Sequence, residues 1–205
     1  MAASITRRGG NTRQRKHRQS GFSLIEVVIS MAVLTVGMVS LLGVFGLAMA
    51  STQTSQQDMI AKQLANEAYE SVVTARNTSQ MNWDQINNTG STDCLSSTPP
   101  CGIFLTGYNP MYNAGADGIF GTADDAASGE EQLQDPGPDG IFQTADDTFI
   151  PLTGYQRQIA ISPLYTAGGT LIPSLKSVTI TVQYATAQMK VQKTYTVNSF
   201  ISQFQ

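Results

Sequence analysis

The sequence predicts an α+β fold, in which one long N-terminal helix packs on a small C-terminal antiparallel sheet. Three observations indicate this fold. The stretch from Phe22 to Ala50 has 29 residues, and Glu26 is the only charged one. The next stretch, to about Asn77, carries apolar side chains every three to four residues, the period of one buried helical face. The C-terminal third alternates apolar and polar residues and is rich in Val, Ile, Thr and Tyr, which is typical of half-buried strands.

A basic leader, residues 1–21, precedes the apolar stretch. It holds six of the twelve basic residues, together with the lone histidine, His17, and it has no acidic residue. Without the leader, six basic and fifteen acidic residues remain, a net charge of −9. These basic residues are scattered, so binding of nucleic acid through a basic patch is poorly supported. The leader's charge is explained by the positive-inside rule, which keeps Lys and Arg on the cytoplasmic side of a membrane.

The junction between leader and apolar stretch reads Gly21-Phe22-Ser23-Leu24-Ile25-Glu26. This string resembles the processing site of type IV prepilins and type II secretion pseudopilins, and the apolar stretch is most similar to PilV-type minor pilins. Two alternatives remain. An ordinary secretory signal has an apolar core of about 7–15 residues that precedes its cleavage site, whereas here the core is longer and follows the junction. A plain membrane anchor would have the same orientation and leave the string as a coincidence.

The resemblance implies a role for three residues of the junction. A prepilin peptidase would cut between Gly21 and Phe22, and the new amino group of Phe22 would be N-methylated. Glu26 would pair with the Phe22 amine of a neighbouring subunit. It also implies an inner-membrane precursor with its head in the periplasm, later a pilus at the cell surface. The implied partners are other pilin subunits, the prepilin peptidase and the inner-membrane pilus assembly machinery.

The expected elements follow in chain order. One helix spans residues 22–77, about 80 Å at 1.5 Å per residue, with its first half transmembrane and its second half amphipathic. Residues 78–205 form a globular head, which gives the lollipop shape that the resemblance implies. The head begins with loops and one short strand around Ile103–Leu105. Its strands are expected at Tyr155–Ile161, Ser177–Tyr184 and Val191–Ile201, the last two joined by a turn near Ala185–Gln188.

Cys94 and Cys101 enclose six residues that include Pro-Pro. Their spacing does not match the close cysteine pairs of zinc sites. In an exported domain the expected state is a disulfide, and two free thiols are the alternative. A loop this short contributes only about 2–3 kcal/mol by the chain-entropy model.

Residues 113–125 and 135–147 form an acidic repeat with its copies 22 residues apart. On the twelve-residue EF-hand loop, each copy places side-chain oxygens at positions one, five and twelve, glycine at six and a backbone carbonyl at seven. The repeat resembles EF-hand-like calcium loops of extracellular proteins. The expected ligands are Asn113, Asp117, Ile119, Asp124 and Asp125 in the first copy, and Asp135, Asp139, Ile141, Asp146 and Asp147 in the second.

The repeat also departs from the EF-hand pattern. Position three is glycine in both copies, position twelve is Asp instead of a bidentate Glu, and no flanking helices are evident. Asp125 and Asp147 are candidates for the missing oxygens. Magnesium fits less well, because it requires near-ideal octahedral geometry. The alternative is a solvated turn that binds no ion tightly. If calcium binds, the second copy should bind it more tightly, because it carries four negative charges against three.

The sequence contains no constellation that indicates an enzyme: there is no histidine outside the leader, no phosphate-binding glycine loop after a strand and no nucleophile motif. The favoured function is therefore that of a minor type IV pilin, a structural and assembly subunit of a pilus with a calcium-stabilised head. A pseudopilin of a type II secretion system is the alternative within the same resemblance. A calcium-dependent surface adhesin that uses the pilin export route is the alternative from another class.

Overall fold

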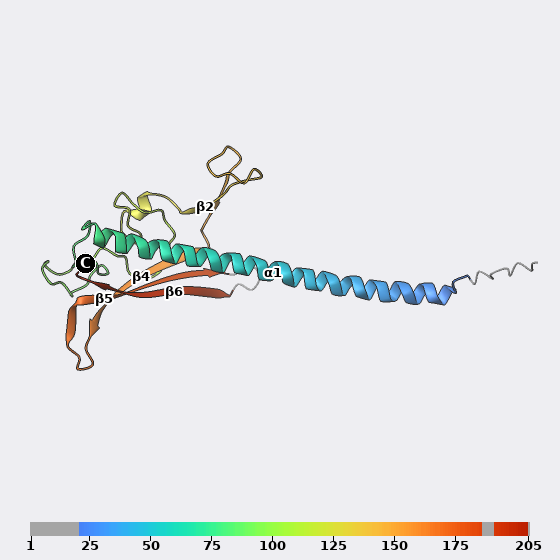
Figure 1. Cartoon of the computed structure of the whole chain (residues 1–205), viewed down its shortest axis with the longest axis horizontal. Coiled ribbons are helices and arrows are strands. Elements are labelled where there is room, and N and C mark those ends of the chain that lie inside the picture. Colours follow the sequence, from blue (N-terminus) through green and yellow to red (C-terminus); the bar gives the residue numbers. More distant parts are fainter. Residues whose placement is uncertain (1–20, 186–190, 205) are drawn as a thin grey trace, which may run out of the picture. The chain divides into compact units, whose positions relative to one another are not determined.

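The computed structural model describes residues 21–185 and 191–204, and it confirms the α+β class (Figure 1). Residues 1–20 of the basic leader and most of the turn expected at residues 185–188 lie outside this part of the chain. The structure divides into two compact units between Ala48 and Met49. The elements are α1 (Leu24–Asn77), β1 (Asn109–Pro110), the 3-10 helix η1 (Asp125–Ala127), β2 (Gln132–Asp135), β3 (Thr148–Pro151), β4 (Tyr155–Tyr165), β5 (Leu171–Ala185) and β6 (Gln192–Ser202).

The first unit contains the apolar half of α1. The helix begins at Leu24, two residues later than expected, and the Ser23 carbonyl accepts the N–H groups of Glu26 and Val27 at 3.0 and 3.3 Å. Residues 24–49 are all exposed. By length and composition this helix can cross a membrane. An apolar surface of this extent needs cover from lipid or from other helices.

The second unit, Met49–Gln205, contains the second half of α1 together with the residues 78–205 expected to form the head, and we call this whole unit the head. Its core lies between the second half of α1 and the sheet. Leu64, Ala68 and Val72 are buried on the expected helical face, together with three further alanines, Ala61, Ala65 and Ala75. Small side chains let the helix backbone approach the sheet closely. The sheet contributes Val178, Ile180 and Val182, all fully buried.

The main sheet is antiparallel, in the order β1-β4-β5-β6. Ile180 of β5 pairs with Ile159 of β4 and Val197 of β6, so apolar residues align on one face. The three long strands are those expected, but β4 and β5 extend further at their shared hairpin. The register shifts at Pro163, where a proline cannot donate to the ladder. The strand that was expected to end at Ile161 therefore continues to Tyr165, with only a local irregularity in its pairing.

The segment between α1 and β1 is tied to the core by single contacts. No strand forms at residues 103–105, and Phe104 instead makes an isolated bridge with Asn88. Phe104 is fully buried. The Asn88 side chain donates to the Ile159 carbonyl at 2.7 Å and accepts the Ile161 N–H at 2.7 Å. These contacts fix the loop against β4 without a regular strand.

A second, two-stranded sheet is formed by β2 and β3, which sequence patterning did not predict. Leu133 pairs with Ile150, and Asp135 pairs with Thr148. The residues between the two strands are the second copy of the acidic repeat. In Figure 1 the loop that β2 and β3 carry stands away from the main sheet and from the second half of α1.

Candidate functional site

The processing junction is accessible. A side chain on Gly21 would meet no atom within 4 Å, and Phe22 is 82% exposed. Both residues precede the first turn of α1, so the peptide bond between them lies in non-helical backbone. A peptidase needs an exposed bond outside regular secondary structure. Among the described residues, nothing covers the expected cleavage site.

Glu26 lies in the first turn of α1 and is exposed. In the described part of the chain, the ion pairs are Arg157–Glu131 and Lys193–Asp58. No described basic side chain thus pairs with Glu26. A carboxylate at the start of an apolar helix is costly in a membrane or a helix bundle unless a positive group joins it.

The first acidic loop gathers three carboxylates. One oxygen each of Asp117, Asp124 and Asp125 lies within 4.8 Å of the others. Gly118, with φ of +69°, turns the chain so that the Ile119 N–H donates to Asp117 Oδ1 at 2.9 Å. The close approach of three like charges is the arrangement that a divalent cation relieves.

Asp125 holds the backbone of this loop together. It is 4% exposed, and its carboxylate accepts the N–H groups of Gly115, Gly121 and Thr122 at 3.0, 2.6 and 3.3 Å. Burial raises the pKa of Asp125 above its ordinary value, although the three N–H groups oppose the rise. Its oxygens are therefore largely committed to the loop itself.

The second acidic loop repeats these hydrogen bonds. The Ile141 N–H donates to Asp139 Oδ1 at 2.8 Å, as Ile119 does to Asp117. Asp147 Oδ2 accepts the Gln143 N–H at 2.6 Å, as Asp125 accepts the N–H of Gly121. The duplicated sequence thus folds twice into the same local structure.

A threonine at position ten of each loop was not among the residues picked out from the sequence. Thr122 Oγ1 lies 2.6 Å from Asp124 Oδ1, and Thr144 Oγ1 lies 2.7 Å from Asp146 Oδ1. These hydroxyls lower the pKa of both aspartates. The sequence does contain a signal for these threonines, because position ten is threonine in both copies of the repeat.

Other expected ligands have partners outside the carboxylate cluster. The amide nitrogen of Asn113 donates to the carbonyls of Ser128 and Glu130 at 3.4 and 3.3 Å. The carbonyls of Ile119 and Ile141 lie 3.2 and 3.0 Å from the threonine hydroxyls. Asp135 Oδ1 accepts the Gly137 N–H at 3.3 Å. Within the described residues, the structure brings together the carboxylates of the first loop but not the full set of expected ligands in either copy.

The two loops differ in how they meet the head. Ile119 and Phe120 are 2% and 8% exposed, whereas the equivalent Ile141 and Phe142 are 61% and 59% exposed. The first loop is thereby anchored in the core. The second loop presents the same apolar pair to solvent.

A buried ion pair lies beside the first loop. The Arg157 guanidinium stacks over the Phe120 ring at 4.3 Å, and its Nη1 lies 3.6 Å from Glu131 Oε2. Neither of these two atoms has a hydrogen-bond partner among the described residues. Burial raises the pKa of Glu131 to about 7, because the long contact with Arg157 offsets only part of the desolvation. The sequence did not predict this ion pair, because its two residues are 26 positions apart and no local pattern links them.

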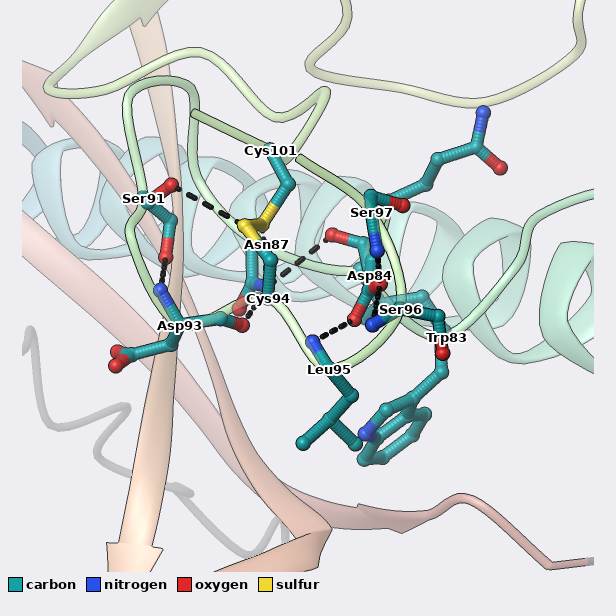
Figure 2. Close-up of a disulfide and its surroundings, with 12 residues drawn as sticks. Trp83, Asp84, Asn87, Ser91, Asp93, Cys94, Leu95, Ser96, Ser97 and Cys101 are labelled. Atoms are coloured by element: carbon teal, nitrogen blue, oxygen red, sulfur yellow. Dashed lines mark hydrogen bonds between the residues drawn. A yellow bond between two sulfur atoms is a disulfide. The ribbon is translucent and has the colours of Figure 1, made fainter. Parts of the chain in front are cut away.

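The two cysteines form the expected disulfide, with an S–S distance of 2.10 Å. Figure 2 shows that the loop between them closes around Asp84. The Asp84 carboxylate accepts the N–H groups of Leu95, Ser96 and Ser97 at 2.7, 2.7 and 2.6 Å. Burial alone would raise the pKa of Asp84, but these N–H groups hold it below its ordinary value. The covalent bond and the carboxylate fix the loop together.

One family model matches the chain: the prokaryotic N-terminal methylation motif, at residues 16–42. No curated protein and no solved structure matches. The motif covers the junction and much of the apolar half of α1, but not the head. It supports a type IV pilin-like or pseudopilin-like protein, and it indicates a structural role and not an enzymatic one. Together with the apolar helix, it fits a membrane-anchored precursor.

Proposed function

We propose that this chain is a minor type IV pilin, a structural and assembly subunit of a pilus. The observation that carries the proposal is the methylation motif at residues 16–42, which runs into a helix whose residues 24–49 are all exposed. A membrane covers such a helix before assembly, and a bundle of neighbouring helices covers it afterwards. The partners are then other pilin subunits, the prepilin peptidase and the inner-membrane assembly machinery.

In this function Glu26 acts as a register device. Cleavage after Gly21 creates a positive amino group on Phe22, four residues before Glu26. A helix that leaves the membrane for a filament core takes its Glu26 carboxylate into apolar surroundings, where an unpaired charge costs several kcal/mol. Only one axial stagger brings the amine of a neighbouring subunit to this carboxylate. The pair therefore selects that stagger.

We propose further that calcium stabilises the head through the acidic loops. The cluster of Asp117, Asp124 and Asp125 offers hard oxygens within 4.8 Å of one another, which suits calcium. The second loop has the same local hydrogen bonds and four carboxylates. The bound ion would offset the repulsion between like charges in each loop. It would stabilise only the folded head, because the unfolded chain does not gather these ligands.

Processing and location test the proposed function. Intact-mass analysis of membrane-purified protein should give a chain that starts at methylated Phe22. Antibody labelling should then find the protein in sheared surface filaments. A chain that keeps residues 1–21 in peptidase-competent cells contradicts the proposal. A processed chain that is absent from filaments, and whose loss blocks protein secretion, indicates the pseudopilin alternative.

A further inference from the structure

Strands β2 and β3 form a stem that carries a loop, and both the stem and the loop expose apolar side chains. We refer to the loop, residues 135–147, as the hairpin tip. Ile141 and Phe142 are 61% and 59% exposed, and on the stem Phe149 and Ile150 are 59% and 49% exposed. A single aromatic side chain can bury 150–250 Å², so these four side chains leave on the order of 300 Å² of apolar surface in water.

The stem gives a second reason to expect a partner. It is a two-stranded sheet of four residues per strand, and every residue of β3 is exposed. A two-stranded hairpin is marginally stable in water unless it packs on something. The first acidic loop shows what the same sequence does when covered, because its Ile119 and Phe120 are in the core. In the hairpin tip the equivalent pair, Ile141 and Phe142, is not packed against the core.

A groove that fits such apolar side chains lies on the same head, between α1 and the first residues of β6. It is open and has a volume of about 680 Å³. We call it the lysine groove; it is lined by Ser55, Asp58, Met59, Lys62, Tyr184, Lys193, Thr194 and Tyr195. Its size lies within the range of about 300–1,000 Å³ that is typical of binding pockets. Met59, 65% exposed, and the tyrosines supply apolar walls.

The charges of the two surfaces are complementary. The hairpin tip carries Asp135, Asp139, Asp146 and Asp147 and no basic residue. In the groove, Lys193 pairs with Asp58 at 3.3 Å, and Asp58 also accepts the Tyr184 hydroxyl. Lys62 is exposed and has no ion-pair partner among the described residues, so the groove has one positive charge in excess. A calcium ion in the tip would still leave it a net charge of −2.

We propose that the hairpin tip of one subunit docks in the lysine groove of a second copy of this chain. Phe142 and Ile141 enter the groove beside Met59 and Tyr195, and the tip carboxylates face Lys62. In a filament this contact is heterologous, and it repeats from copy to copy without closing into a ring. Such a contact builds an open assembly. The inference rests on the proposed function as a filament subunit and names one head-to-head contact within it.

Cysteine cross-linking between two differently tagged full-length copies, produced together and treated in membranes with a short bis-maleimide, tests the contact. One copy carries Phe142→Cys and the other Met59→Cys. The matched control replaces Met59→Cys by Phe200→Cys, because Phe200 is 67% exposed and lies outside the groove. The native cysteines are joined in their disulfide. We expect a hetero-tagged product from the groove pair that clearly exceeds that of the control pair.

Adding Lys62→Glu to the Met59→Cys copy should lower the yield about fivefold, which corresponds to roughly 1 kcal/mol of binding. Equal yields from the groove and control pairs would overturn the docking contact. So would a dominant product between two Phe142→Cys copies, which indicates a symmetric tip-to-tip contact. The mass of the same protein reports cleavage after Gly21. A processed chain without the expected cross-link refutes the docking alone, whereas an unprocessed chain refutes the proposed function.

Discussion

The buried carboxyl of Glu131 should give the head an unusual dependence on pH. Its pKa is raised from 4.5 to about 7 by burial. Between these two values the folded head holds a proton that the unfolded chain has already lost. The free energy of unfolding therefore falls as the pH rises through this window. At about 1.4 kcal/mol per pKa unit, the loss between pH 4.5 and pH 7 is about 3 kcal/mol.

Apart from Asp125, the groups with shifted pKa values titrate mainly outside this window. The pKa values of Asp58 and Asp84 are lowered, so their contributions to stability are lost only below about pH 4. The pKa of Lys176 is lowered to about 8, so it makes the head more stable as the pH rises above 8. Asp125 acts in the same direction as Glu131, because its pKa is also raised. A variant at Glu131 is therefore needed to separate the two.

Urea unfolding of the head, residues 49–205, from pH 4.5 to pH 8 provides the measurement, in EDTA so that calcium does not contribute. Glu131→Gln should flatten most of the fall in stability between pH 5 and pH 7. Arg157→Met should instead extend the fall above pH 7, because the Arg157 charge opposes the rise in the pKa of Glu131. If the free energy of unfolding depends on pH in the same way in Glu131→Gln and in the unmodified head, burial does not raise the pKa of Glu131.

Three further predictions concern assembly, the disulfide and the metal. Glu26→Ala should accumulate normally in the membrane but be depleted from sheared filaments, as quantitative immunoblots of both fractions would show; equal incorporation contradicts the register role. Cys94→Ser should lower the free energy of unfolding by about 2–3 kcal/mol in urea titrations, and no change would mean that the Asp84 contacts alone fix the loop. Asp139→Ala should weaken calcium binding in calorimetric titrations more than Asp117→Ala does.

The sequence predicted the helix and the long strands because their periods are direct consequences of burial on one face. Leu64, Ala68 and Val72 recur at helical spacing, and β5 alternates along most of its length. β2 and β3 were not predictable in this way, since four-residue strands carry too little periodic signal. The loops tied by Asn88 and Phe104 were also missed, because single contacts between distant residues leave no local pattern.

For the candidate site, local chemistry was predictable and its surroundings were not. The acidic loops and the cysteine pair are each encoded within a short segment, so spacing identified them. The anchoring of one loop and the exposure of the other depend on where each copy falls relative to the core. Similarly, Asp84 and the Arg157–Glu131 pair acquire their roles only when distant segments meet.

The order of calcium affinity between the two loops follows from how their carboxylates are already used. The first loop is better gathered, but Asp125 is buried, accepts three backbone N–H groups and has a raised pKa, so it is a weaker ligand than Asp117 or Asp124. In the second loop the equivalent Asp147 is half-buried. Burial alone would raise its pKa, but hydrogen bonds from Thr144, Gln134 and the Gln143 N–H hold the pKa below its ordinary value, so the carboxyl stays ionised.

The second loop must order more exposed side chains, at about 0.5–1.5 kcal/mol each. It offers four carboxylates in return, against three in the first loop, one of which is buried, and ligand charge is a main determinant of calcium affinity. We therefore expect the second loop to bind calcium more tightly. A larger loss of affinity in Asp117→Ala than in Asp139→Ala would show that gathering of the ligands outweighs their charge.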